Sequence, residues 1–255
     1  MSTRTRRLLT TVVTAVLLGA WSPAAAASSG PPADPASSWP GPTPVQAPGE
    51  AVADDFESDY RTALDVVDAY WRAHYDDFFS GTYSAPGLLP GALGPGLYDY
   101  PAEQFYCGDQ LLTEGNAWYC VPEDFVAFEI DLMAEWERLG DAFIYLVVAH
   151  EWAHAVAADF DPSLIAPAFE LQADCLAGAA IQGAVDDGLL VVESGDTAEF
   201  EASLVAVAGE FPWGTVFLDE NGEPQTETHG SAQERVDAFD RGATGGVPAC
   251  LPTGG

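Results

Sequence analysis

The chain has 255 residues, 48% of them hydrophobic, and carries 40 acidic side chains against 8 basic ones, for a formal net charge of -32. It has no lysine, and three of its arginines lie within the first seven residues. Nucleic-acid binding requires clustered cationic side chains that neutralise phosphates, so this charge balance excludes nucleic acid as an expected partner. The acidic surface is typical of an extracellular protein that stays soluble in salt.

The N-terminus has the three parts of a secretory signal peptide. Arginines precede a short apolar run that ends in small residues, and we place cleavage near Ala27, so that the signal peptide covers residues 1–27. The apolar run is shorter than the roughly 20 residues that span a bilayer, and Pro23 follows it, so no stable membrane span is expected after cleavage. The chain is predicted to be secreted, and the pair Arg6-Arg7 leaves twin-arginine export open beside the general route.

The segment after the signal peptide predicts a linker. Residues 28–50 are dense in proline, serine and glycine, a composition that cannot bury enough apolar surface to offset the entropy of ordering. Residues 51–252 are long enough to form one domain around a single core.

Periodicity predicts the elements at the start of this domain. Apolar side chains at steps of three and four predict an amphipathic helix over residues 54–79. A loop rich in glycine and proline follows. Aromatic and polar residues then alternate over residues 98–128, which predicts a small antiparallel sheet, and FVAFEID (residues 125–131) is its best strand candidate.

From Leu132 onward the pattern is helical. Residues 133–140 form the first predicted helix, and the second covers residues 141–160, where apolar side chains nearly surround the axis, as in a helix buried in a core. A turn-rich insert containing Pro212 separates the last two predicted helices. The remaining helices are predicted at residues 166–185, 196–209 and 231–241.

The four cysteines are an even set in a chain predicted to enter an oxidising compartment, so two disulfides are expected. Three pairings are possible. Cys107 and Cys120 enclose a short segment with glycine and asparagine, GDQLLTEGNAWY, which favours a local disulfide and leaves Cys175 to pair with Cys250. Because no CxxC pair is present, a four-cysteine zinc site is disfavoured.

The segment HEWAH, residues 150–154, matches the HExxH zinc motif. Residues four apart lie one above the other on a helix, so His150 and His154 can reach one ion. Glu151 lies beside the first ligand, where it can take a proton from water without closing the coordination sphere. A chance match is the alternative. However, unpaired polar side chains are costly on a buried helix, and a bound metal ion would give the two histidines a partner.

A catalytic zinc site needs a third protein ligand and an open position. Glu170 and Asp174 lie four apart on one predicted helix, and Glu170 follows His154 by 16 residues. We assign Glu170 as the ligand and Asp174 as the acceptor of a hydrogen bond from a ligating imidazole, since such rings usually donate their second nitrogen to a carboxylate. The spacing also permits the reverse assignment.

Two further residues are candidates near the last predicted helix. His229 opens that helix and could donate a hydrogen bond to the oxyanion of a tetrahedral intermediate, with a structural helix-entry histidine as the alternative. Arg235 is expected to form a structural ion pair with Asp174 or Glu170, with a substrate carboxylate as its alternative partner.

Several segments together resemble the bacterial neutral zinc metallopeptidase family, a gluzincin-like group, over roughly residues 104–250. They are HEWAH, FELQADCLAG, THGSAQERVDAF, the upstream YCVPEDFVAFEID and a cysteine near the end. The ExxxD that Glu170 heads is similar to the glutamate ligand motif of CAAX prenyl endopeptidases. The family usually has glycine and histidine where this chain has Ala153 and Ala155. The resemblance also implies the pairing of Cys175 with Cys250.

The resemblance implies an α+β fold: a mainly helical, zincin-like domain with two zinc-ligand helices and a small antiparallel sheet. It implies a zinc metallopeptidase that uses Zn2+, with Glu151 as the general base, and peptide or protein as the substrate. Endopeptidase activity is the leading expectation. Two alternatives are a non-catalytic, zinc-stabilised extracellular binding or scaffold protein and a zinc amidase acting on cell-wall peptides. The sequence does not predict the oligomeric state.

Overall fold

The computed structural model describes residues 56–208, 216–218, 224–226 and 230–252 of the chain. The predicted signal peptide, the predicted linker, Pro212 and His229 lie outside these residues, and of the predicted turn-rich insert the structure describes residues 216–218 and 224–226. The described part combines helices with short strands, which is compatible with the predicted α+β class.

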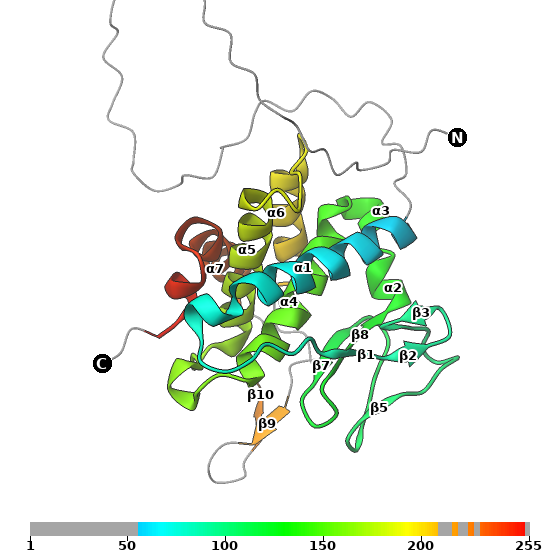
Figure 1. The fold of residues 1–255 in the computed structure, drawn as a ribbon. Coiled ribbons are helices and arrows are strands. Elements are labelled where there is room, and N and C mark those ends of the chain that lie inside the picture. Colours follow the sequence, from blue (N-terminus) through cyan, green and yellow to red (C-terminus); the bar gives the residue numbers. More distant parts are fainter. Residues whose placement is uncertain (1–55, 209–215, 219–223, 227–229, 253–255) are drawn as a thin grey trace, which may run out of the picture.

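Helices make up most of the described chain (Figure 1). They are α1 (Phe56–Phe78), α2 (Ile130–Met133), α3 (Trp136–Leu139), α4 (Ala142–Ala158), α5 (Phe169–Asp186), α6 (Asp196–Ala206) and α7 (Ala232–Gly245), with the 3-10 turns η1 (Pro162–Leu164) and η2 (Val247–Cys250). The strands are β1 (Gly87–Leu88), β2 (Pro90–Gly91), β3 (Gly94–Pro95), β4 (Leu97–Tyr98), β5 (Tyr106–Cys107), β6 (Gln110–Leu111), β7 (Ala117–Cys120), β8 (Phe125–Glu129), β9 (Val216–Leu218) and β10 (Pro224–Thr226).

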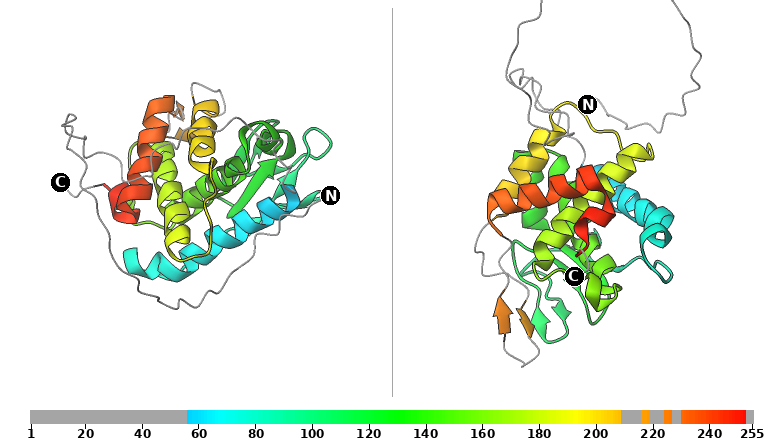
Figure 2. Two further views of the ribbon diagram at one scale, coloured as in Figure 1. Left: turned by 90° about the horizontal axis from the view of Figure 1, so that it is seen from above. Right: turned by 90° about the vertical axis from the view of Figure 1, so that its left-hand side faces the viewer.

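Helix α4 lies in the core. Its apolar side chains point in every direction around the axis, so the helix is stable only where other elements cover it on all sides. Helices α1, α5 and α6 pack against it, and α5 also packs against α7. Figures 1 and 2 show α1 running across the helical layer, with the sheet at one end of the molecule. The helix that carries HEWAH is therefore held rigidly from several directions.

The amphipathic helix predicted over residues 54–79 is α1, and its apolar face covers α4 and α5. The last predicted helix is also present, as α7. Ser231 caps its first turn in a reciprocal capping box with Glu234, and the helix continues past Arg241 to Gly245. Helical spacing therefore predicted these two elements to within a few residues.

The main sheet is organised around β8. Strand β7 pairs with it antiparallel, from Ala117 opposite Phe128 to Cys120 opposite Phe125, as the alternating pattern predicts. Strands β1 and β4 pair with β8 in the parallel direction, so the sheet is mixed where a purely antiparallel one was expected. Three separate two-stranded pairs, β2 with β3, β5 with β6 and β9 with β10, are antiparallel.

One parallel strand, β1, comes from the glycine- and proline-rich segment that was expected to be a loop, whereas β4 follows that segment and includes Tyr98, the first residue of the predicted sheet region. Two residues of β1 and two of β4 follow one another along β8, and the β2–β3 hairpin lies between them in the chain. Such short pairings are imposed by the neighbouring strand and leave no periodic pattern of their own. A Cβ at Gly91 would collide with the carbonyl oxygen of Leu97, so only glycine permits this close approach.

Strand β8 ends earlier than predicted. The side chain of Glu129 accepts hydrogen bonds from the backbone N–H groups of Asp131 and Leu132, and it thereby caps a short helix, α2, that begins at Ile130. The last two residues of FVAFEID are therefore helical, and the helix predicted over residues 133–140 is split into α2 and α3.

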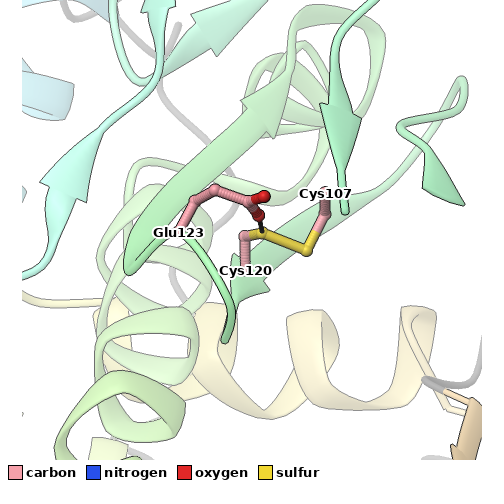
Figure 3. A group of neighbouring side chains, drawn as sticks. All are labelled: Cys107, Cys120 and Glu123. Carbon is pink, nitrogen blue, oxygen red and sulfur yellow. Dashed lines mark hydrogen bonds between the residues drawn. A yellow bond between two sulfur atoms is a disulfide. The ribbon is translucent and has the colours of Figure 1, made fainter. Parts of the chain in front are cut away.

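Both predicted disulfides are present. The Cys107–Cys120 bridge joins β5 to β7, and the carboxylate of Glu123 lies 2.7 Å from the Cys120 sulfur while it accepts a hydrogen bond from the Gly108 N–H (Figure 3). The Cys175–Cys250 bridge joins α5 to η2. Two disulfides fit an extracellular protein. Among the described residues, no helix is both long and apolar enough to cross a bilayer.

Candidate metal centre

Two helices bring the HExxH histidines and Glu170 together. His150 and His154 lie one turn apart on the same face of α4, and Glu170 lies in the first turn of α5, which packs against α4. His150 Nε2 lies 3.1 Å from His154 Nε2 and 3.1 Å from Glu170 Oε2, and His154 Nε2 lies 3.6 Å from the same carboxylate oxygen.

These three ligand atoms fit a metal ion. They lie within 4.8 Å of one another. Metal–ligand bonds of about 2.0–2.1 Å in a tetrahedral site place neighbouring ligand atoms about 3.3 Å apart, close to the three distances found here. Two imidazoles and one carboxylate suit several divalent metals, so the residues present could hold such an ion.

Asp174 lies behind His150, one turn of α5 beyond Glu170. Its Oδ1 is 2.9 Å from His150 Nδ1, an interaction that places the proton on Nδ1 and leaves the Nε2 lone pair facing the other two ligand atoms. Asp174 is fully buried. Of the two acidic residues that the sequence offered, the structure therefore brings Glu170 to the ring nitrogens and sets Asp174 to orient His150.

Arg235 completes a buried chain of charged groups. Its Nε and one terminal nitrogen donate to the two oxygens of Asp174, at 2.8 and 2.7 Å, and the other terminal nitrogen donates to the Val207 carbonyl at 2.9 Å. This bidentate geometry gives Asp174 the partner that a buried carboxylate requires. Arg235 thus reaches the candidate metal centre through Asp174 and His150.

Burial and neighbouring charges shift the pKa values of the cluster in a consistent pattern. Burial opposes charge on His150, but Asp174 and Glu170 outweigh it and raise the pKa of the ring. Burial likewise opposes ionisation of Glu170, but His154 and His150 hold the pKa of that carboxyl well below its usual range. Without a metal ion, a proton on the histidine rings balances the ionised carboxylates, and a bound cation would take the place of that proton.

Glu151 differs from Glu170 in its surroundings. It is 7% exposed, and burial raises its pKa although both histidines oppose that shift. A raised pKa makes a carboxylate a stronger base than a solvated glutamate. Glu151 is therefore a buried carboxyl group with a raised pKa that lines both pockets beside the three ligand atoms.

Two pockets meet at the metal centre. The first has a volume of about 200 Å³ and the second about 290 Å³, and four residues line both of them: Asn116, Ala117, His150 and Glu151. His154 and Glu170 line the second pocket alone. The candidate metal centre thus opens into a cleft that extends to both sides of Glu151.

Asn116 was not identified from the sequence, yet it lies where the two pockets join. Its Oδ1 accepts a hydrogen bond from the Ala117 N–H, so the side-chain amide nitrogen is the end available to a bound molecule. A single asparagine in the segment GNAWYC carries no periodic signal that would have indicated this position. Only the packing of β7 against α4 places it there.

Glu129 was also missed. Its side chain is fully buried and accepts backbone N–H hydrogen bonds from the turn before β7, from the segment after β4 and from the start of α2. The donors are Gly115, Tyr100, Asp131 and Leu132. One carboxylate therefore fixes the turn that carries Asn116. Its only trace in the sequence is an acidic residue in an otherwise apolar strand.

Two other clusters in the described chain have metal-ligating side chains. Cys107 and Cys120 are joined in a disulfide beside Glu123, so this group offers no thiolate (Figure 3). Asp141, Asp196 and Glu199 gather at the starts of α4 and α6. His229 lies outside the described residues, so its part in the site stays a prediction.

Comparison with known proteins finds no relative: no family model matches the chain, and neither a curated protein nor a solved structure matches it. Its function is therefore inferred from the geometry of the site.

Proposed function

We propose that this chain is a secreted zinc metallopeptidase that cleaves within peptide chains. The observation that carries the proposal is the convergence of His150, His154 and Glu170 on one point, with Glu151 beside them in an open cleft. A purely structural metal site needs ligands alone and is usually closed by a fourth. A non-catalytic scaffold protein would have no need for the buried carboxylate of Glu151, which is not one of the three ligands.

The donor set favours zinc. Two imidazoles and one carboxylate are the ligands of a common class of catalytic zinc sites, in which a fourth position stays open. When bound, zinc acts as a Lewis acid and acidifies water at its open position. Asp174 and Arg235 hold the His150 ring in the orientation that such binding requires.

Glu151 carries the proton in the proposed reaction. Its carboxylate accepts a proton from the attacking water as the new carbon–oxygen bond forms at the scissile carbonyl. It then gives that proton to the leaving nitrogen as the carbon–nitrogen bond breaks. The raised pKa of Glu151 supports both transfers, because the group must hold the proton between them.

The surroundings of the cleft support a peptide as the substrate. Strand β7 pairs with β8 along one edge, and in the described part of the chain no other strand pairs with it. Its residues Ala117, Trp118 and Tyr119 line the pocket that also contains His154. An extended peptide can pair with an open strand edge through main-chain hydrogen bonds. A compact small molecule cannot form this row of hydrogen bonds, so the edge favours a peptide substrate. The resemblance to neutral zinc metallopeptidases supports the same reaction.

Replacement of Glu151 by glutamine tests the proposal. The E151Q variant and the unaltered protein should both bind one zinc per chain, because no ligand changes. Its hydrolysis of casein should fall by about 10² to 10⁴, the usual contribution of a general acid–base group. Zinc is measured by elemental analysis and hydrolysis by release of new amino termini.

The matched control for this test is Glu201→Gln, which alters an exposed carboxylate on α6 that lines neither pocket. It should leave casein hydrolysis within about twofold. Undiminished hydrolysis by E151Q would contradict the mechanism. Hydrolysis of purified peptidoglycan in place of casein would favour the cell-wall amidase, and zinc binding without hydrolysis of either would favour the scaffold protein.

A further inference from the structure

The Cys107–Cys120 bridge presents its two cysteines unequally to solvent. Cys107, at the end of β5, is half-buried, whereas Cys120, at the end of β7, has no exposed surface. A thiol exchanges with a disulfide by direct attack on one of the two sulfur atoms, so it must first reach that atom. Of the two residues, only Cys107 has surface through which a thiol can approach. Attack there makes Cys120 the leaving sulfur.

The carboxylate of Glu123 lies beside this leaving sulfur. Its Oε2 is 2.7 Å from the Sγ of Cys120 (Figure 3). The two carboxylate oxygens also accept hydrogen bonds from the Gly108 N–H, at 3.1 and 3.3 Å, and these bonds fix the position of the group. No described arginine or histidine forms an ion pair with Glu123, so no cation neutralises its charge.

A negative charge at this position opposes the release of Cys120. The attacking thiolate forms a bond to the Cys107 sulfur, the sulfur–sulfur bond breaks, and its electron pair leaves on Cys120 as a thiolate. Like charges that lie close together disfavour ionisation, so Glu123 disfavours this thiolate and slows the step that releases it. The thiolate then takes a proton from water, and the resulting S–H can donate to the Glu123 carboxylate.

We propose that small thiols modify this bridge at Cys107, and that Glu123 keeps the reaction slow. The product is a mixed disulfide on Cys107 and a free thiol at Cys120. The inference goes beyond the proposed function and does not depend on it. It concerns the cleft because Cys120 ends β7, and the preceding residues of this strand line the larger pocket. Slow exchange therefore keeps this wall of the cleft covalently attached to β5 when thiols are present.

The first test locates the product. The full chain is treated briefly with 2-mercaptoethanol, and excess N-ethylmaleimide then stops the reaction and labels free thiols. Peptide mass mapping should show the mercaptoethanol adduct on Cys107 and the maleimide label on Cys120. The Cys175–Cys250 bridge is an internal comparison that should react more slowly, because both of its cysteines are buried. An adduct mainly on Cys120, or equally on Cys107 and Cys120, would overturn the proposal.

Glu123→Gln tests the role of the charge. Glutamine keeps an oxygen for the Gly108 N–H but carries no charge, so the rate constant for exchange should rise about three- to tenfold. Asp124→Asn is the matched control, because Asp124 is the neighbouring exposed carboxylate and accepts a hydrogen bond from Tyr119. Asparagine tolerates the left-handed backbone at this position, where φ is 51°. The exchange rate of this control should stay within about twofold of the unaltered protein.

Glu123→Ala separates the effect of charge from that of structural support. Alanine removes both the charge and the acceptor for Gly108, whereas glutamine removes the charge alone. Faster exchange in both variants supports the proposal. If only Glu123→Ala is faster, Glu123 acts by holding the turn between β5 and β6, and the proposed effect on the leaving thiolate is wrong. Each readout is the rate or the position of thiol exchange, so the outcome does not depend on whether the protein hydrolyses peptides.

Discussion

At the scale of single residues, the centre depends on two carboxylates that look equivalent in the sequence. Glu170 and Asp174 lie one helical turn apart, yet one meets the ring nitrogens of both histidines and the other lies behind His150 with Arg235. Their different partners assign them different tasks. Glu170 could offer an oxygen to a metal ion, and Asp174 orients the His150 ring.

This difference predicts unequal losses of metal affinity. Glu170→Ala removes one of three ligands and should abolish stoichiometric zinc binding. Asp174→Asn keeps the shape but loses a charged acceptor of the His150 N–H, and it should weaken zinc binding by about 10- to 100-fold. Competition with a chromogenic chelator measures both. Asp186→Asn, at the exposed end of α5, is the control that should bind zinc normally. Equal losses in both variants would contradict the assignment.

At the scale of elements, α1 is tied to the end of α5 by a histidine that the sequence did not single out. His74 Nε2 lies 2.7 Å from Asp187, and Nδ1 lies 3.1 Å from Asp77. The hydrogen bond to Asp187 is the main cause of a raised pKa for His74. The protonated ring therefore binds two carboxylates and holds two helices together.

The sign of this shift predicts how stability changes with pH. Because the pKa of His74 is raised on folding, its stabilising contribution is complete below the unfolded pKa of about 6.5 and is lost as pH rises through the folded value. His74→Asn should therefore lower the melting temperature more at pH 6 than at pH 9. Arg61→Gln, which breaks the exposed ion pair with Glu57 on the same helix, should have nearly the same effect at both pH values. If the effect of His74→Asn on the melting temperature does not depend on pH, protonated His74 does not hold α1 and α5 together.

A second titrating group lies where α4 and α6 begin. Glu199 accepts a hydrogen bond from the Ala142 N–H, and burial together with Asp141 raises its pKa to about 7. The folded state then binds a proton that the unfolded state has already lost, so stability should fall as pH rises from about 4.5 to 7.

Glu199→Gln keeps an acceptor for Ala142 and removes this titration. The variant should melt at a higher temperature than the unaltered protein at pH 8, and the difference should shrink towards pH 5. Glu201→Gln, at an exposed position two residues further along α6, serves as the control. A lower melting temperature of Glu199→Gln at pH 8 would show that the ionised carboxylate stabilises the fold.

At the scale of the whole molecule, the two disulfides act on different parts of the site. Cys175–Cys250 ties the helix that carries Glu170 and Asp174 to the end of the described chain, and the carbonyl of Cys250 also accepts a hydrogen bond from Gln172. Cys107–Cys120 instead holds β7, which forms one wall of the cleft.

Removal of each bridge should therefore have a distinct result. The paired substitution of Cys175 and Cys250 by alanine should lower the free energy of unfolding by about 2 to 5 kcal/mol and weaken zinc binding, because the ligand helix loosens. The same substitution of Cys107 and Cys120 should raise KM for peptides while zinc binding is retained. Urea denaturation, chelator competition and peptide kinetics distinguish the two. If zinc binding is lost only when Cys107 and Cys120 are replaced, the disulfide that supports the metal ligands is Cys107–Cys120 and not Cys175–Cys250.

The sequence by itself determined what depends on local spacing. Helical periodicity predicted α1, α4, α5 and α7, the HExxH spacing predicted that two imidazoles share a face, and the short segment between Cys107 and Cys120 favoured their pairing. Each of these follows from neighbours a few residues apart, where backbone geometry relates spacing in the sequence to direction in space.

Only the tertiary structure decided what depends on contacts between distant segments. Strand pairing with β8 made β1 a parallel strand out of an expected loop and gave β4 a parallel direction, and the capping of α2 by Glu129 shortened the expected strand. The packing of α5 on α4 gave Glu170 and Asp174 different hydrogen-bond partners. The packing of β7 against α4 placed Asn116 in the cleft. No periodicity encodes these arrangements, because each arises where side chains far apart in the chain exclude water together and satisfy one another's polar groups.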